Sequence, residues 1–500
     1  MPDNYDLDLQ SMQEARLLAI RAREAQREFM SAAQEEVDNI CHAMADAAFR
    51  AAELLGKLAN EETGYGVALH KRVKNEFASK NIWDSIKDIK TVGVISRDDT
   101  RKIVNIAWPM GVIAALTPST NPTSTAIYKV LIAVKARNGI IIAPHPAAKS
   151  SSYEAVRIMA EAGEAVGMPK GLISCMQKVS LEGTQELMRH YAVSLILATG
   201  GTPMVKAAHS VGKPAIGVGP GNVPVYVDRS ADIEKAAFDI VNSKAFDCSV
   251  ICSTEQCVVA DKPIADQLRI AMQKNGAYWL PDEDISKIEK ILFTPNGAMN
   301  PTAVGKTPQQ LAKIAGISVP KFARVLVADL AGVGKEYPLS REKLTTVLGF
   351  FTEEDWHAGC ERCIQLIKFG GDGHSLVIHA RNEDVIMAFG LEKPAFRIIV
   401  NSWSTMGAIG ATTGLMPSLT LAPGGIGGAV IGDNITVSHL MNIKRLAYET
   451  NPPPALATTP APDVEWSGMA LPTSISNISS MDMVIDEVVK RVIAEINKQT

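Results

Sequence analysis

The sequence lacks the features that mark membrane, secreted and nucleic-acid-binding proteins. Its 500 residues contain no apolar run of the roughly 18 residues that a membrane-spanning helix needs. The acidic first ten residues do not show the basic and then apolar pattern of a secretory signal, which favours a cytoplasmic protein. The formal net charge of -4 argues against a nucleic-acid partner, because such surfaces normally carry a basic excess.

Cysteine is also sparse. The seven cysteines are an odd number without framework spacing, which predicts reduced thiols and no disulfide scaffold. Cys360 and Cys363 have the spacing of a metal or redox pair, but they lie in helical sequence and no second pair accompanies them. We therefore predict no metal site.

The chain is long enough for two large α/β lobes. Residues 9–59 are rich in Ala, Glu, Arg and Leu, contain no proline, and predict two or three helices. Residues 91–107 alternate apolar and polar side chains around a polar tip, which predicts a hairpin. Between residues 111 and 227, short apolar strands alternate with amphipathic stretches, and this pattern predicts a parallel, doubly wound sheet.

The C-terminal end combines a linker with an amphipathic segment. The linker, residues 451–480, begins with NPPPALATTPAP, a composition that is unlikely to pack. In residues 481–500, apolar side chains recur at helical spacing from Ile485 to Ile496, with charged side chains on the rest of the wheel. This pattern predicts a tethered amphipathic helix that docks on its own protein or on another one.

Three segments carry the candidate chemistry. Cys252 lies among small and polar residues in the segment 246–256 (FDCSVICSTEQ), although an isolated cysteine is more often a small buried apolar residue than a nucleophile. The segment 199–205 (TGGTPMV) follows a strand and opens a helix, so its free N–H groups could bind a pyrophosphate; an ordinary turn has the same pattern. The segment 217–222 (GVGPGN) would let the backbone approach a reacting centre closely.

In this order and spacing, the three segments resemble the aldehyde dehydrogenase superfamily. The resemblance is to its CoA-acylating branch, similar to the aldehyde half of bifunctional aldehyde-alcohol dehydrogenases, and it covers residues 10–450. The further matching motifs, in chain order, are TPSTNPT (117–123), RNG (137–139), PHP (144–146), EKL (342–344), GH (373–374) and PSLTL (417–421). The resemblance implies two doubly wound α/β lobes with an oligomerisation arm.

The same resemblance implies a division of the chain into domains. Residues 1–87 and 108–231 would form a dinucleotide-binding domain, and residues 232–433 would form a catalytic domain. Residues 88–107 and 434–450 would form the oligomerisation arm of a homodimer or homotetramer.

Two residues would carry the oxidation of an aldehyde. By the resemblance, Cys252 attacks the aldehyde carbonyl as a thiolate, and the product of hydride transfer to nicotinamide is a thioester. The Asn121 side-chain amide and the backbone N–H of Cys252 would hold the developing oxyanion.

The resemblance also implies a nicotinamide cofactor site. Glu342 would hydrogen-bond the nicotinamide ribose, with a solvated surface glutamate as the alternative, and Gly201 would let the cofactor phosphates approach closely. For His374, a structural loop histidine is an equal alternative. The other residues placed at the cofactor are Thr199, Gly200, Thr202, Val205, His145, Pro146 and Gly219.

The sequence leaves the choice between NAD and NADP open. His145 and Ala148 stand where hydrolytic relatives commonly carry a lysine and a glutamate that contact the adenosine ribose. The acid that would repel a 2′-phosphate is therefore missing, and Lys149 could bind a phosphate or face solvent. We favour NAD.

A further difference from hydrolytic members of the superfamily concerns the molecule that accepts the acyl group. Hydrolytic members typically carry a glutamate base near the second glycine turn, whereas this sequence has Gly221 and Asn222 there. Water attack on the thioester should then be slow, while a CoA thiolate needs no base. The sequence therefore predicts acyl-CoA formation from acetaldehyde or propionaldehyde. Sulfoacetaldehyde is an alternative substrate, and a hydrolytic enzyme or a non-catalytic scaffold is an alternative function.

The tethered helix suggests a location. It resembles the encapsulation peptides of enzymes that are packaged into bacterial microcompartments, where an apolar face docks on shell or cargo proteins. The resemblance implies a cytoplasmic protein inside such a compartment.

Overall fold

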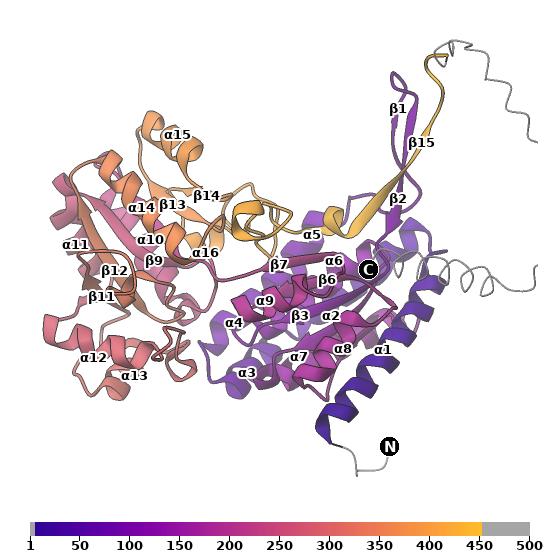
Figure 1. Cartoon of the computed structure of the whole chain (residues 1–500), viewed down its shortest axis with the longest axis horizontal. Helices are drawn as coiled ribbons and strands as arrows, with labels where there is room; N and C mark the ends of the chain where they lie inside the picture. The colour runs from indigo at the N-terminus through magenta and orange to yellow at the C-terminus, as the bar shows by residue number, and fades with distance from the viewer. Residues whose placement is uncertain (1–5, 453–500) are drawn as a thin grey trace, which may run out of the picture. The chain divides into compact units, whose positions relative to one another are not determined.

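A computed structural model describes residues 6–452 of the chain, which begins with a series of helices (Figure 1). The first helix buries a stripe of small side chains, including Ala15, Ala19 and Ala22, because residues three and four apart share one face. The structure has three helices up to Thr63, which confirms the predicted two or three. The helical elements of this region are α1 (Leu7–Phe29), α2 (Gln34–Arg50), α3 (Ala52–Thr63), α4 (Ala68–Glu76), the π-helical turn η1 (Phe77–Asn81) and α5 (Ile82–Ile86).

A five-stranded parallel sheet forms the centre of the first lobe. Its order is β5-β4-β3-β6-β7, so the chain winds outwards from β3 in one direction and then from β6 in the other. β3 and β4 are buried along their whole length, as strands with helices on both faces must be. The elements are β3 (Val112–Thr117), α6 (Pro122–Lys135), β4 (Gly139–Pro144), α7 (Lys149–Glu164), β5 (Ile173–Cys175), α8 (Leu181–Arg189), β6 (Val193–Thr199), α9 (Thr202–His209) and β7 (Ala215–Val218).

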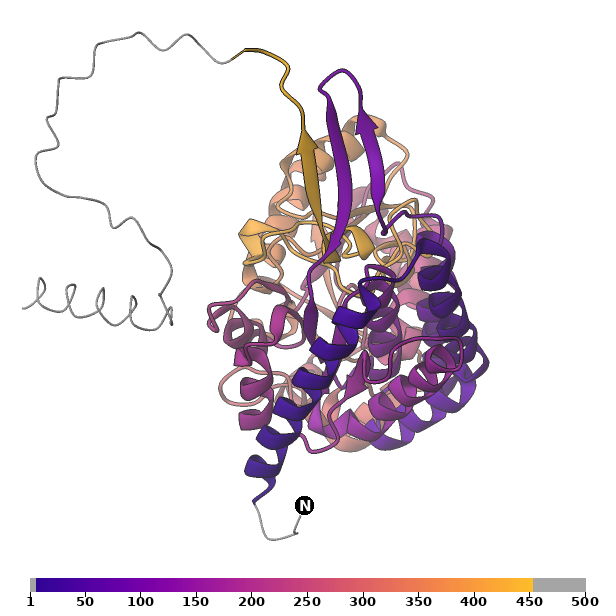
Figure 2. The ribbon, with the colours of Figure 1, turned by 90° about the vertical axis from the view of Figure 1, so that its right-hand side faces the viewer.

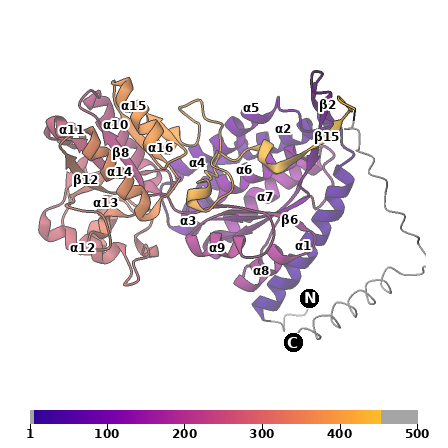
Figure 3. The same cartoon turned by 45° about the horizontal axis from the view of Figure 1, so that its top comes forward.

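A seven-stranded sheet, with the order β10-β11-β12-β9-β8-β13-β14 and parallel pairing throughout, forms the second lobe (Figure 3). Alternate residues of β8 face opposite sides, so that Val225 packs in the cluster that contains α10 and Tyr226 packs in the cluster that contains α14. The strands are β8 (Val223–Val227), β9 (Glu255–Asp261), β10 (Ala277–Trp279), β11 (Val325–Asp329), β12 (Val347–Glu353), β13 (Leu376–His379) and β14 (Ile398–Val400). The helices are α10 (Ile233–Ala245), α11 (Ala265–Lys274), α12 (Asp282–Leu292), α13 (Pro308–Ala315), α14 (Trp356–Gly370), α15 (Glu383–Glu392) and α16 (Ser404–Gly407).

Strand β8 corrects the predicted boundary between the lobes. We placed it in the dinucleotide-binding domain, within residues 108–231, but it pairs with β9 and β13 of the second sheet. The chain therefore changes sheets in the glycine-rich segment 217–222, whose first two residues end β7 and whose last residue directly precedes β8. The prediction was wrong because buried strands of two parallel sheets have the same apolar composition, and only their pairing separates them.

The predicted hairpin over residues 91–107 is confirmed. β1 (Val94–Asp98) and β2 (Ile103–Pro109) pair antiparallel, and β15 (Met441–Ala447) adds to β2 in the order β1-β2-β15. Figure 2 shows the three strands side by side. This small sheet consists of the two segments that we predicted as the arm, and most residues of β15 are exposed.

The predicted C-terminal helix, residues 481–500, lies outside the described residues, as does the predicted linker beyond Pro452. Among residues 6–452, no helix combines the length and the apolar character that crossing a membrane requires.

Candidate active site

A cavity of about 330 Å³ contains most of the residues that the sequence singled out. The chain brings them together from both lobes, across more than two hundred positions. The predicted residues that line this cavity are Asn121, His145, Thr199, Gly200, Gly201, Gly219, Cys252 and Glu342.

The topology of the two sheets explains the place of the cavity. β3 and β6 are neighbours whose connections run to opposite sides of the first sheet, which makes the space beyond their carboxyl ends a switch point for ligand binding. Thr199 ends β6, and Asn121 follows β3 before α6 begins. Cys252 comes from the second lobe, just before the amino end of β9.

Cys252 differs from the other cysteines in its exposure. It is partly exposed and lines the cavity, whereas the other six cysteines are all buried. Cys360 and Cys363 lie in α14, as their helical sequence predicted. Thiol chemistry with a substrate in the cavity is therefore open to Cys252 alone.

The turn that precedes Cys252 is strained. Asp247, Cys248 and Ser249 have φ values of 48°, 52° and 65°, three consecutive left-handed conformations without a glycine. Each such residue costs on the order of 1–3 kcal/mol and persists only where its surroundings hold it. The loop that presents Cys252 must therefore be fixed by contacts elsewhere.

The surroundings of Cys252 favour the neutral thiol. Burial, followed by the nearby Glu342 carboxylate, raises the pKa of Cys252 to about 12, although the Arg397 guanidinium and backbone N–H groups act in the opposite direction. The thiolate, which is the reactive form of a cysteine, is therefore the minor form of Cys252 at neutral pH, so a bound ligand or a proton acceptor is needed to increase its share.

Glu342 lies inside the site and not on the solvated surface that we considered as an alternative. It lines the cavity, and its Oε1 accepts a hydrogen bond from the Gly221 N–H at 3.0 Å. Burial raises the pKa of Glu342 to about 7. Glu342 is the one carboxylate among the described residues that line the cavity.

The turn after β6 offers part of an anion site. No side chain caps the N-terminus of α9, where Gly201 is the capping residue. Pro203 has no N–H, and the Met204 and Val205 N–H groups donate to the Gly201 carbonyl oxygen, so the Thr202 N–H is the donor of the first turn that could bind an anion. A side chain at Gly201 would meet only the Pro203 ring, at 3.8 Å, and one at Gly219 would meet nothing within 4 Å. The backbone at both glycines is thus open to a cofactor phosphate.

Four of the predicted cofactor residues do not line the cavity. Thr202 and Pro146 are exposed beside it, and Val205 packs against Gly217. His374 is only 1% exposed and lies behind Gly221, where burial, followed by the Arg397 charge, lowers its pKa to about 3. For His374, this position favours the structural alternative.

The glycine turn has no room for a base. A Cβ atom at Gly221 would stand 2.5 Å from the Cys252 carbonyl oxygen and 2.9 Å from the His374 ring. The Asn222 amide is buried and donates to the carbonyl oxygens of Ser340, at 2.9 Å, and Leu366, at 2.7 Å. Both residues therefore have structural roles, and neither can activate a water molecule.

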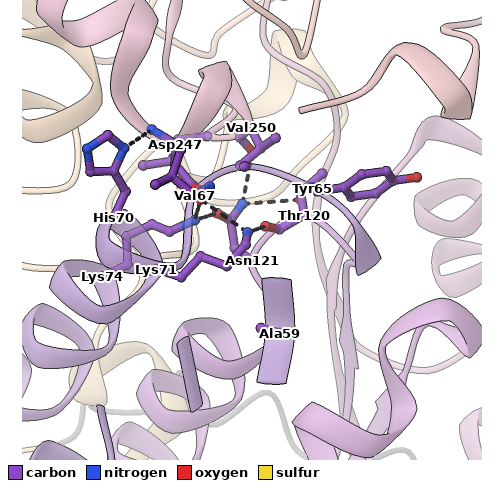
Figure 4. A network of polar contacts seen from close by, with 12 residues as sticks. Ala59, Tyr65, Val67, His70, Lys71, Lys74, Thr120, Asn121, Asp247 and Val250 are labelled. Carbon is purple, nitrogen blue, oxygen red and sulfur yellow. Dashed lines mark hydrogen bonds and ion pairs between the residues drawn. The ribbon is translucent and has the colours of Figure 1, made fainter. Parts of the chain in front are cut away.

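Sequence analysis missed the charged residues that surround Asn121. Lys74 of α4 donates to Asn121 Oδ1, and both Lys74 and Lys71 contact the buried Asp247 carboxylate (Figure 4). No signal in the sequence separates these two lysines from the solvated lysines that helices commonly carry.

Comparison with known proteins decides the family. Residues 7–279 match the model of the aldehyde dehydrogenase family. The chain belongs to this family. It is 40% identical over 439 residues to the bifunctional aldehyde-alcohol dehydrogenase AdhE of Escherichia coli (strain K12), covering 87% of this chain and 49% of that protein. The chain thus spans about half the length of this relative.

Solved structures of other aldehyde dehydrogenases share the fold over nearly their whole length. An acetylating enzyme from Geobacillus thermoglucosidasius is 48% identical with a TM-score of 0.89, over 90% of this chain and 99% of that one. A propionaldehyde dehydrogenase from the fucose utilisation microcompartment of Clostridium phytofermentans is 30% identical with a TM-score of 0.78, over 86% and 96%. The Rhodopseudomonas palustris propionaldehyde dehydrogenase, solved with bound CoA and an acylated cysteine, is 28% identical with a TM-score of 0.78, over 87% and 97%.

The different exposure of the cysteines predicts selective alkylation. Iodoacetamide should modify Cys252 first, at a rate that still rises with pH up to pH 9 because the pKa of this thiol lies above that range. The measurement is peptide mass spectrometry over time on the native protein. Cys252→Ala is the control, and rapid labelling of another cysteine in this variant would contradict the assignment.

The negative charge of Glu342 predicts how a substitution at this residue changes the reactivity of Cys252. Because this carboxylate raises the pKa of Cys252, Glu342→Gln should lower that pKa and increase the alkylation rate at pH 8, by about 2- to 10-fold for a shift of up to one unit. Glu336→Gln, a change at another glutamate of the same segment, is the control. An unchanged or slower reaction of the Glu342 variant would show that the two groups are not coupled.

Proposed function

We propose that this chain is a CoA-acylating aldehyde dehydrogenase. In this reaction, an aldehyde, CoA and NAD⁺ or NADP⁺ give acyl-CoA, the reduced cofactor and a proton. The observation that carries the proposal is the glycine turn beside Cys252, which leaves no space for a water-activating side chain at position 221. The kinship with acetylating enzymes and with the CoA-bound structure supports it.

The cavity residues divide the reaction between them. Cys252 Sγ bonds to the aldehyde carbon, while Asn121 and the Cys252 N–H bind the oxygen, which takes the negative charge. A nicotinamide cofactor bound in this cavity would supply the acceptor for the hydride that leaves that carbon. The CoA thiolate then attacks the thioester on Cys252, forming the new C–S bond, and the Cys252 thiolate leaves.

The lining of the cavity also bears on the substrate. Among the described residues that line it there is no lysine or arginine, while Ile251, Ile409, Leu419 and Leu421 give it apolar walls. A sulfonate would require a cation or several donors. We therefore favour acetaldehyde or propionaldehyde over sulfoacetaldehyde. We also favour NAD over NADP, because Lys149, the candidate ligand of a 2′-phosphate, is not among the residues that line this cavity.

One observation favours hydrolysis as a second candidate function. The pKa of Glu342, raised to about 7, would suit a general base for water attack. The hydrogen bond from Gly221 holds this carboxylate, however, and by the family resemblance its role is to orient the nicotinamide ribose. An experiment can separate these two roles of Glu342. Removal of the carboxylate would abolish release of the free carboxylic acid only if Glu342 is the base.

The deciding assay follows reduction of the cofactor with acetaldehyde, in the presence and absence of CoA, and identifies the product. Without CoA we expect about one reduced cofactor per active site, because the thioester on Cys252 is released only by a thiol. With CoA we expect continuous turnover to acetyl-CoA. Cys252→Ala should lose all activity and keep its unfolding temperature. Continuous release of acetate without CoA would establish the hydrolytic function. If no short aldehyde is oxidised, a non-catalytic scaffold remains as the candidate function.

The strands β1, β2 and β15 are further proposed to join subunits in a homodimer or homotetramer. Trp108, Ile443 and Leu446 of this arm are 41%, 41% and 49% exposed, and among residues 6–452 no strand pairs with the outer edge of β15.

Charges on this arm should therefore separate the subunits. The double variant Ile443→Lys and Leu446→Lys should elute as a smaller species in size-exclusion chromatography with light scattering. Asn442→Lys, an addition of charge on the same strand, is the control. An unchanged mass of the double variant would place the interface elsewhere.

From the sequence alone, we propose that residues 481–500 direct the enzyme to a microcompartment. The similarity to the propionaldehyde dehydrogenase from a Clostridium phytofermentans microcompartment supports this location. Removal of residues 463–500 should keep turnover and release the enzyme from compartment fractions. Loss of folded protein would instead assign the segment a structural role.

A further inference from the structure

Two lysines on one turn of α4 are buried against a single aspartate. Lys71 and Lys74 are each 2% exposed and Asp247 is not exposed at all, and both ammonium groups contact Asp247 Oδ2, that of Lys71 at 3.2 Å (Figure 4). Burial lowers the pKa of Lys74 to about 8, and the Asp247 carboxylate opposes this shift, so the ammonium form predominates at neutral pH. Burying three charges costs free energy that apolar side chains would not cost, so stability alone does not explain the cluster.

Lys74 makes one contact that Lys71 does not make. Its Nζ donates to Asn121 Oδ1, whereas Lys71 Nζ donates to the Thr120 carbonyl oxygen at 3.2 Å. An ammonium group can only donate, so the Asn121 amide cannot turn its own NH₂ group towards it. The amide nitrogen must therefore face the opposite way, where it donates to the Val250 carbonyl oxygen at 3.0 Å.

Asp247 connects the same lysine to the loop of the nucleophile. Its Oδ1 accepts the Val67 N–H at 2.7 Å, and its own N–H donates to His70 Nδ1 at 2.8 Å. Asp247 is also the first of the three left-handed residues that lead to Cys252. The segment around the start of α4 thus holds the strained turn at its first residue.

We propose that Lys74 is a positioning residue for the oxyanion site, which it aligns by holding the Asn121 amide nitrogen towards the Cys252 loop while Asp247 holds both Lys74 and that loop. This inference rests on the proposed function, because it requires an oxyanion at the aldehyde oxygen. In the structure, the Asn121 amide nitrogen donates to Thr120 Oγ1, at 3.1 Å, and to the Val250 carbonyl oxygen. When a substrate oxygen enters the site, one of these two N–H groups would donate to that oxygen instead. The positive charge on Lys74 polarises the amide and strengthens this donor.

The test compares Lys74→Met with Lys71→Met. Each variant removes one of the two cations at Asp247 and keeps an apolar chain of similar length, but only the first releases Asn121. The readout is the first turnover of acetaldehyde oxidation without CoA, by stopped-flow absorbance of the reduced cofactor. Loss of an oxyanion donor typically costs about 100-fold or more, so we expect a decrease of about 10- to 100-fold for Lys74→Met, mainly in the rate at saturation, and a smaller one for Lys71→Met. Equal losses in both variants would overturn the inference.

A double-mutant cycle separates positioning from general damage. In an Asn121→Ala background, Lys74→Met should lower the rate by less than about 3-fold, because the amide that it positions is gone. Alkylation of Cys252 by iodoacetamide builds no oxyanion, so Lys74→Met should leave that rate within about 3-fold of the unmodified protein. Additive losses in the cycle, or alkylation slowed as much as oxidation, would assign Lys74 a structural role and overturn the inference.

The outcomes also distinguish this inference from the proposed function. If the unmodified enzyme oxidises acetaldehyde but releases acetate without CoA, acyl transfer to CoA is wrong and the cycle still measures the role of Lys74. If CoA-dependent turnover is present and Lys74→Met oxidises acetaldehyde at the unmodified rate, the proposed function stands and the inference fails.

Discussion

The active site depends on the crossing of the chain from one parallel sheet to the other between β7 and β8. Parallel strands end at one edge of a sheet, so the loops after β3 and β6 share the switch point of the first lobe. The crossing segment, residues 217–222, brings the amino ends of β8 and β9 to the same place, and Cys252 comes with them. Neither lobe alone contains both Cys252 and the glycine turn at residues 199–201.

Close packing at this crossing also constrains the chemistry. Gly221 lies so near the Cys252 carbonyl that no side chain fits, and its N–H holds Glu342. The same burial raises the pKa values of Cys252 and Glu342, because a site with little water disfavours both charged forms. Exclusion of water and the absence of a base at this turn act in the same direction, since both disfavour attack by a water molecule on any acyl group bound to Cys252.

The buried cluster at α4 shows how the protein holds an unfavourable geometry. Three left-handed residues before Cys252 and three buried charges beside Asn121 each cost free energy. They meet at Asp247, which contacts Lys74, Val67 and His70 and is itself the first residue of the strained turn. Such a network gives precise placement and little stability, which is typical of groups that serve a reaction.

Patterns in the sequence were sufficient to predict the helices before Thr63, the hairpin of residues 91–107, the alternating α/β pattern, and the order of the motifs around Asn121, Cys252 and Glu342. These are local patterns, because periodicity and turn residues act over a few positions. Three facts came from the folded structure and not from the sequence: the sheet to which β8 belongs, the burial of His374 behind Gly221, and the contact of Lys74 with Asp247. Those facts join residues far apart in the chain, and a buried lysine or strand has the same local sequence whichever partner it finds.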